Sequence, residues 1–233
     1  MKNILEWFVE EAKTIFGNNL NSMILYGSRA NAPEVGKKSD HNVLILLKSA
    51  STQDLKPFGN TVRKWVFAGN PPPSVFSSDM FAKSADVFPI EFLDMKMNRK
   101  VLFGEDTLVN IEIDEKNLRH QCEYELKIKL LGIKKAGMLA KRDRDFREIM
   151  AGSISPVLSV VKHSVRLFGE KTPKSRLEAL EVLKSKLGID PEIFITALNI
   201  KHKDPSVKSV KAEPLFDRYT AELEKIVNAV DNI

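Results

Sequence analysis

Two short stretches decide the fold of this chain, LYGSRA at residues 25–30 and SDHNVLI at residues 39–45. An apolar run lies in or beside each stretch, Met23–Tyr26 for the first and Val43–Leu47 for the second. Both runs are too short for helices and predict buried strands. The sequence therefore predicts two strands that flank a polar loop opening with Gly27 and Ser28.

The residues around these strands predict two helices and a third strand. Ile4–Phe16 has apolar residues at helical spacing, and Leu55–Phe67 predicts an amphipathic helix that cannot continue through Pro71–Pro73. Val87–Leu93 predicts the third strand. Pro89 would place that strand at a sheet edge or at its own start, because proline donates no ladder hydrogen bond.

From Leu118 onward the pattern changes, since apolar residues recur every three or four positions and strand-like runs disappear. This spacing predicts about five helices, over Leu118–Met138, over Ile149–Phe168, from Thr172-Pro173 to Gly188, from Asp190-Pro191, and after Pro214. We expect an α+β domain at residues 1–113 and an all-α helical bundle domain at residues 114–233.

The composition excludes several classes of protein. With 43% hydrophobic and 29% charged residues, the 233-residue chain is neither disordered nor collagen-like nor a disulfide scaffold. Its longest apolar run, Val43–Leu47, is far shorter than the roughly 18 residues of a membrane-spanning helix. Glu6, Glu10 and Glu11 would interrupt a signal peptide, and a lone cysteine suits a reducing compartment. We expect a cytoplasmic protein with no membrane partner.

The net charge of +5 is unevenly distributed. Up to Lys116 there are 14 basic and 15 acidic residues, and from Asn117 on there are 22 and 16. The bases within Lys134–Arg147 alternate with acids, which indicates a solvated helix face rather than a nucleic-acid surface. The scattered His120, His163 and His202 indicate no zinc site.

The loop between the two strands has residues suited to binding a phosphorylated ligand. A strand that ends in Gly27-Ser28 presents backbone amides and a hydroxyl at a helix N-terminus, where an anion is favoured. Arg29 adds a charge-assisted contact. Asp40 and Asn42 are two positions apart on a strand and therefore leave the same face, whereas His41 points to the other face as a packing residue.

These motifs resemble the signature of the nucleotidyltransferase superfamily: a strand, a Gly-Ser turn opening a short helix, and a second strand with an Asp-x-Asp pair. Kanamycin-type and minimal nucleotidyltransferases share this core, and several append a helical bundle. The resemblance implies an α+β fold with a mixed sheet, flanking helices and an all-α bundle. It also implies a metal site of Asp40, Asn42 and Glu91, with Asp40 and Glu91 as catalytic carboxylates and Asp94 as a rival to Glu91. The ligands implied are Mg²⁺ or Mn²⁺ and a nucleoside triphosphate, foremost ATP, bound by Gly27, Ser28 and Arg29.

Asn42 departs from the superfamily pattern, because an amide stands where the second aspartate is expected. Two unit charges about 4 Å apart interact by roughly 4 kcal/mol at an effective dielectric near 20, so the lost charge weakens metal binding. Two functions stay open. One is transfer of a nucleoside monophosphate to a hydroxyl of a small molecule or protein, by metal-assisted phosphoryl chemistry. The other is a degenerate, non-catalytic regulatory protein that binds a nucleotide or a partner.

The sequence identifies neither an acceptor-activating base nor an oligomeric state. Kanamycin-type enzymes place an acceptor-activating glutamate on their helical domain, but no motif selects among Glu123, Glu125 and Glu148. A homodimer is likewise left open.

Overall fold

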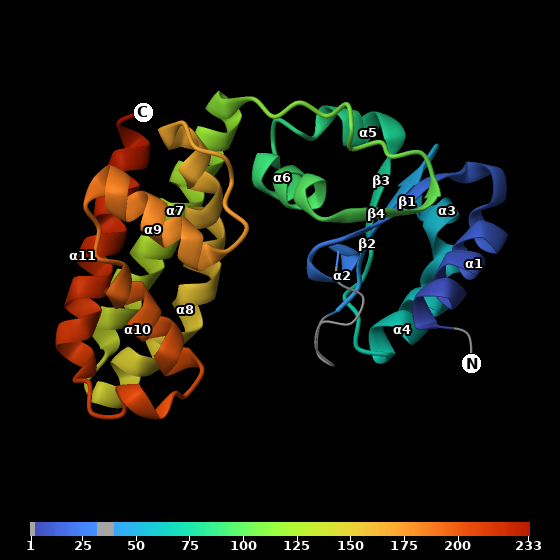
Figure 1. The fold of residues 1–233 in the computed structure, drawn as a ribbon. Helices are drawn as coiled ribbons and strands as arrows, with labels where there is room; N and C mark the ends of the chain where they lie inside the picture. Colours follow the sequence, from blue (N-terminus) through green and yellow to red (C-terminus); the bar gives the residue numbers. More distant parts are fainter. Residues whose placement is uncertain (1–2, 32–39) are drawn as a thin grey trace. The chain divides into compact units, whose positions relative to one another are not determined.

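The computed structural model describes residues 3–31 and 40–233. The chain divides into two compact units, Met1–Ile113 and Asp114–Ile233, each with its own secondary structure (Figure 1).

The first unit is built on a four-stranded mixed sheet in the order β3-β2-β1-β4. Its inner strands β1 and β2 pair antiparallel, β4 pairs antiparallel with β1, and β3 pairs parallel with β2. The two strands expected at the central motif are confirmed, and the sheet has two edge strands that the sequence pattern did not predict. The bounds are β1 Leu20–Tyr26, β2 Asn42–Leu47, β3 Ser74–Ser77 and β4 Arg99–Gly104.

The expected strand at Val87–Leu93 is wrong, because Val87 lies in a turn and Pro89 begins helix α6, Pro89–Met97. Pro89 occupies the first helical position, where its missing N–H costs no intrahelical bond. Glu91 lies in the first turn, where the helix dipole favours an acid. Proline and glutamate are therefore a helix-start signal that the short apolar run concealed.

The helices of the first unit pack in two layers, one on each face of the sheet (Figure 1). On one face Phe8 of α1 stacks on Trp65 of α4 at 4.1 Å between ring centroids. On the other face the ring centroids of Phe81 in α5 and Phe92 in α6 lie 4.7 Å apart. The bounds are α1 Ile4–Phe16, α2 Ser28–Asn31, α3 Thr52–Leu55, α4 Gly59–Phe67, α5 Ser78–Lys83 and α6 Pro89–Met97.

Two of these helices had been expected. The helix at Ile4–Phe16 is confirmed. The expected Leu55–Phe67 helix is interrupted by a 3-10 turn at Lys56–Phe58, which contains Pro57.

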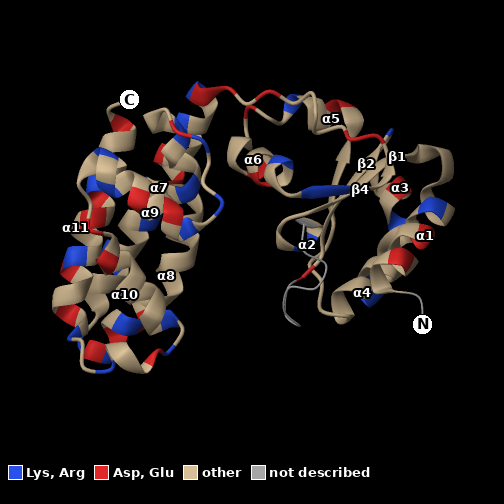
Figure 2. Cartoon of the chain, viewed as in Figure 1, with Lys and Arg blue, Asp and Glu red and all other residues tan. Residues whose placement is uncertain are grey.

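The second unit is the expected bundle of five α-helices, with acidic and basic residues mixed over its helices (Figure 2). One expected start is wrong, since α9 begins at Arg176, where the Ser175 side chain accepts from the Glu178 amide, and not at Thr172. Pro214 lies within the first turn of α11 rather than before it. No helix in the described ranges is long and apolar enough to cross a membrane. The bounds are α7 Glu115–Leu139, α8 Asp143–Ser164, α9 Arg176–Leu187, α10 Pro191–Lys201 and α11 Ala212–Asp231.

Replacing Gly104 by alanine is expected to destabilise the first unit strongly. Gly104 ends β4 with φ +71°, and a Cβ there would lie 2.1 Å from the Asn21 carbonyl oxygen. We expect Gly104→Ala to lower the free energy of unfolding by about 3 kcal/mol or more, since both the conformation and the space forbid a side chain. Urea unfolding followed by tryptophan fluorescence measures this, because both tryptophans, Trp7 and Trp65, lie in this unit.

Gly69→Ala is the matched control. Gly69 also has a positive φ, +91°, but no atom lies within 4 Å of its added Cβ. Gly69→Ala should lower the free energy of unfolding by the backbone strain alone, about 1 kcal/mol. Equal losses in the two variants would show that the contact with Asn21 does not matter.

Candidate functional site

The Gly27 turn connects β1 to the short helix α2. Gly27 has φ +82°, its amide donates to the Asn98 carbonyl at 2.9 Å, and its carbonyl accepts from the Ala30 amide at 3.0 Å. A Cβ at Gly27 would lie 3.1 Å from Nδ2 of Asn42. The left-handed conformation favours glycine here, and a side chain would also press on the Asn42 amide.

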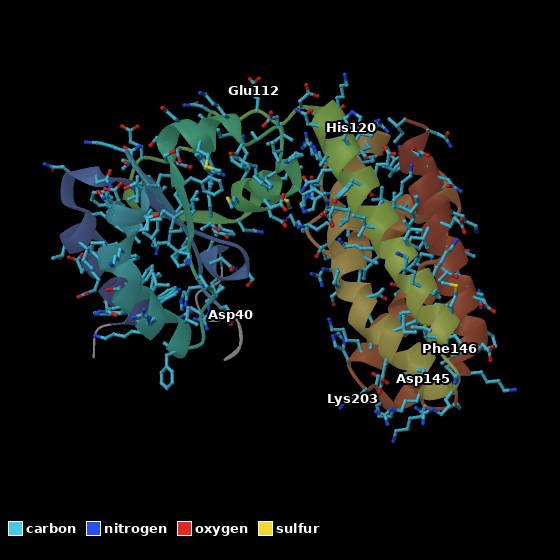
Figure 3. The ribbon with its side chains drawn as sticks, turned by 180° about the vertical axis from the view of Figure 1, so that it is seen from behind. Asp40, Glu112, His120, Asp145, Phe146 and Lys203 are labelled. Carbon is cyan, nitrogen blue, oxygen red and sulfur yellow. The ribbon has the colours of Figure 1, made fainter. Side chains whose placement is uncertain are left out.

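Asp40 and Asn42 lie where the chain reaches β2. Asn42 is the first residue of β2, is half-buried, and pairs across the strands with Tyr26. Asp40 precedes the strand and is exposed, and Figure 3 shows it where β2 begins. The structure thus brings Asn42 against the Gly27 turn, with Asp40 two residues away on the solvent side.

His41 lies on the opposite face of the sheet from Asn42, as expected for a packing residue. Its backbone N–H donates to Oδ1 of the buried Asn70 at 3.1 Å, and its ring Nδ1 lies 3.0 Å from the same oxygen. Its Nε2 lies 3.3 Å from a guanidinium nitrogen of Arg29. Arginine only donates and Oδ1 only accepts, so these contacts suit the tautomer with the proton on Nδ1.

This histidine links the predicted anion-binding arginine to the core. Its ring centroid lies 5.8 Å from that of Trp65, which is fully buried and donates through Nε1 to the Pro71 carbonyl at 2.9 Å. Arg29 is thereby supported by a chain of contacts that ends in the hydrophobic core. The sequence pattern identified His41 as a packing residue but gave no sign of Asn70, because the two are 29 positions apart.

Glu91 and its rival Asp94 lie together on helix α6 and not on a strand. Residues three apart on a helix are neighbours, and both side chains line a cavity of about 350 Å³. Asn42 lies on the same face of the sheet as this cavity, because Tyr26, its cross-strand partner, is one of the lining residues. The other lining residues are Ser74, Phe76, Phe88, Phe92 and Met95.

Comparisons with known protein families and with curated proteins find no match. Among solved structures, the chain is similar to spectinomycin adenyltransferase AAD(9) from Enterococcus faecialis, crystallised with ATP and spectinomycin. The TM-score is 0.58 at 10% sequence identity, over 95% of this chain and 98% of that one. The fold is that of a nucleotidyltransferase. The resemblance inferred from the Gly-Ser turn and the second strand is confirmed at the level of the fold.

Within the nucleotidyltransferase fold, the residues present do not fit a magnesium site of three carboxylates. No group of three or more histidine, cysteine, aspartate or glutamate side chains in residues 3–31 and 40–233 is placed to hold a metal ion. Neither β3 nor β4 contains an acid, and the β4 residue that pairs with Tyr26 is Arg99. Asp40 and Glu91 are the two carboxylates of the predicted set, and Glu91 comes from α6 rather than from a strand.

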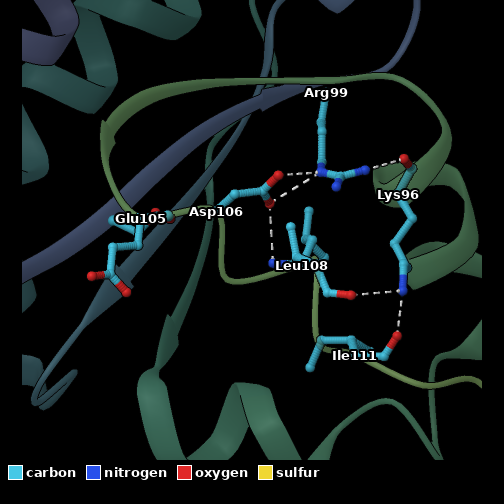
Figure 4. Close-up of polar contacts among 8 residues, drawn as sticks. Lys96, Arg99, Glu105, Asp106, Leu108 and Ile111 are labelled. Atoms are coloured by element: carbon cyan, nitrogen blue, oxygen red, sulfur yellow. Dashed lines mark hydrogen bonds and ion pairs between the residues drawn. The ribbon is translucent and has the colours of Figure 1, made fainter.

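Arg99 has a structural role beside the site (Figure 4). Its Nε donates to the two carboxylate oxygens of Asp106 at 3.0 and 2.8 Å, and another guanidinium nitrogen donates to the Lys96 carbonyl. Asp106 also accepts from the amide of Leu108, which is fully buried under the sheet. The Arg99 guanidinium is therefore neutralised by Asp106 within the fold, and it holds the segment after β4 in place.

The three glutamates considered as acceptor-activating bases all lie in ion pairs of the bundle. Glu123 pairs with Arg119 and Lys127. Glu125 accepts from Lys129, and Glu148 accepts from Arg144. These contacts are between residues four apart on one helix, so they stabilise the helices and single out none of the three.

Replacing Asn70 by alanine tests the support of the site. The side chain is 7% exposed, and its loss leaves the His41 amide without its acceptor. We expect Asn70→Ala to lower the free energy of unfolding by about 1–3 kcal/mol, the cost of a buried donor left unpaired. Denaturant unfolding measures this. Asn60→Ala, at an exposed position whose side chain accepts from Arg63, should change stability by less than about 0.5 kcal/mol. A loss as small in the Asn70 variant would contradict the supporting role.

Proposed function

We propose that this protein binds a nucleoside triphosphate, ATP foremost, at the Gly27 turn of its first unit. The observation that carries the proposal is the Gly27-Ser28-Arg29 turn, packed against Asn42 at the start of β2, in a chain whose fold follows that of an adenyltransferase over 95% of its length. Backbone amides and the Ser28 hydroxyl would face the phosphates, and Arg29 would add the charge. Because α2 has four residues, its dipole contributes little, and the turn amides and Arg29 provide most of the binding.

The proposed role of Arg29 is tested by measuring ATP binding calorimetrically. Arg29→Ala is expected to weaken binding by roughly tenfold or more, the usual worth of a charge-assisted contact to phosphate. Arg63→Ala is the matched control, because Arg63 is an exposed arginine of α4 whose guanidinium donates to nearby Asn60 on the same helix. Equal affinities in the wild type and both variants would contradict binding at this turn.

The reaction class is the second part of the proposal. A fold shared with an adenyltransferase favours transfer of a nucleoside monophosphate to a hydroxyl, with the second unit shaping the acceptor site. The donor set favours binding without transfer, since Asn42 supplies no charge and the described residues contain no group of three acids placed to hold a metal ion. We propose that the wild-type chain binds nucleotide as a regulatory, non-catalytic member of the fold and does not transfer it.

Transfer is tested with α-labelled nucleotides, magnesium or manganese, and a panel of hydroxyl acceptors. The wild type is expected to transfer no label. Asn42→Asp is expected to bind the metal–nucleotide complex at least roughly tenfold more tightly, because it adds a third carboxylate charge to those of Asp40 and Glu91. The double variant that combines Ser28→Ala with Asn42→Asp controls for binding at the turn. Label transfer by the wild type would refute the non-catalytic role and establish the transferase instead.

A further inference from the structure

The second unit contains a cavity of about 320 Å³ where α8 faces the end of α10 and the segment that follows it. Three aliphatic side chains line this cavity, Ala151, Ile200 and Val207, and the last two are buried. Every other lining residue is charged: Arg147, Glu148, Lys201, Lys203, Asp204 and Lys208. All of these residues are described, and Figure 3 shows Lys203 at one end of the bundle. A mainly apolar lining with a few polar groups is typical of small-molecule sites, and this volume is near their lower limit.

Both acids at the cavity already serve the fold. The Glu148 carboxylate accepts from Arg144 at 2.7 Å, four residues earlier on α8. The Asp204 carboxylate accepts from the Ser206 amide at 2.8 Å and caps a 3-10 turn at Pro205–Val207. Glu148 is therefore neutralised by an ion pair, whereas Asp204 keeps its charge, because the hydrogen bonds from Ser206 lower the pKa of its carboxyl.

Arg147 is also committed to the fold. Its Nε donates to the Asp143 carboxylate at 2.8 Å, and its two terminal nitrogens donate to the carbonyls of Val207, at 3.1 Å, and Val210. The guanidinium is thus neutralised by an acid of its own helix, and it fixes the segment that contains Lys208 against α8.

The three lysines of the cavity have no acidic partner. The Lys201 ammonium donates to the Ser155 hydroxyl, and none of the three lysines forms an ion pair with a residue in 3–31 or 40–233. We call Lys201, Lys203 and Lys208 the lysine rim. Three lysines against one unneutralised acid leave two positive charges at the cavity. This excess favours an anionic ligand.

The backbone at Lys203 is strained. Lys203 follows His202, the last cap residue of α10, and its φ of +58° is the one positive φ among the described residues other than glycine. Glycine is the usual residue at this position, because a Cβ is unfavourable in the left-handed conformation. The amides of Lys203 and Asp204 donate back to carbonyls of α10 at 3.1 and 2.9 Å, which holds the strained turn in place. A lysine kept in such a turn at a cavity indicates a role for its charge.

We propose that this cavity binds a small organic anion, with the apolar body of the ligand against the three aliphatic residues and its anionic group at the lysine rim. Lysine ammonium groups act as mobile point charges, so the rim accepts a phosphate, a sulfonate or a carboxylate. The proposal is independent of nucleotide binding at the Gly27 turn, because the cavity lies wholly in the second unit.

Calorimetric titration of the full chain with naphthyl phosphate tests the proposal, since this probe combines an aromatic body with one phosphate. The wild type is expected to bind the probe. Inorganic phosphate and naphthol are each expected to bind at least roughly tenfold more weakly, because each lacks one half of the interaction. Absence of probe binding, or inorganic phosphate that binds as tightly as the probe, would overturn the proposal.

Removal of two rim charges tests where the probe binds. Lys203→Gln combined with Lys208→Gln is expected to weaken probe binding by roughly tenfold. Lys174→Gln is the matched control, because Lys174 is exposed, belongs to the same unit and does not line the cavity. Arg29→Ala should bind the probe as tightly as the wild type, which distinguishes this site from the nucleotide turn. Unchanged affinity in the double variant would contradict the lysine rim as the anion site.

Lys203→Gly separates the charge of Lys203 from its effect on the fold. Because glycine relieves the strain, the thermal unfolding midpoint followed by circular dichroism is expected to rise by about 2–4 °C. Probe binding is expected to weaken by roughly threefold, since one rim charge is lost. A raised midpoint with unchanged probe affinity would show that Lys203 has no part in binding.

Ala151→Leu tests the apolar half of the site, because it fills the cavity and leaves every charge in place. Probe binding is expected to weaken by roughly tenfold or more at unchanged helix content. Full affinity in this variant would show that surface charge alone holds the probe, and the cavity would be refuted as its binding site.

Discussion

The antiparallel pairing of β1 with β2 is the constraint on which the rest of the first unit depends. These strands occupy the middle of the sheet, so both faces of each are covered. Their register places Leu25 opposite Val43 on one face and Tyr26 opposite Asn42 on the other. A shift of one residue would turn the Asn42 amide toward the Phe8–Trp65 core and would separate it from Gly27, so burial of the apolar residues enforces the geometry of the site.

The same register divides the site between two faces of the sheet. On the face that carries α1 and α4, His41 joins Arg29 to Asn70 and thereby ties the turn to the core. On the face that carries α6, Tyr26 lines a cavity with aromatic walls, and its cross-strand partner Asn42 lies on the same face. Arg29 is thus held through His41 from the face that carries α1 and α4. Glu91 and Asp94 come from α6 on the other face, so the anion-binding arginine and the acids are held by different elements.

The shared fold does not by itself decide the chemistry, because function resides in the side chains placed on it. Nucleotide binding at the turn needs backbone amides, a hydroxyl and one arginine, all of which this chain has. Phosphoryl transfer needs concentrated negative charge to hold a metal ion, and the first residue of β2 supplies a neutral amide in its place. This difference in charge is the physical basis for proposing binding without transfer.

How far the sequence could be interpreted depended on whether the signals were local. Unbroken apolar runs, helical spacing and the Gly-Ser turn lie within a few residues of one another, and by themselves they determined the two central strands, the helix at Ile4–Phe16, the five-helix bundle and the departure at Asn42. The edge strands β3 and β4 are short or charged, and they become strands because β2 and β1 offer them hydrogen-bonding partners. Pro89 and Glu91 suited either an edge strand or a helix start, and only packing on the sheet decided for α6. Once α6 forms, Glu91 and Asp94 are neighbours because they lie three residues apart on one helix. Tertiary structure alone brought Asn70 to His41, because contacts between distant segments are set by the fold and not by spacing along the chain.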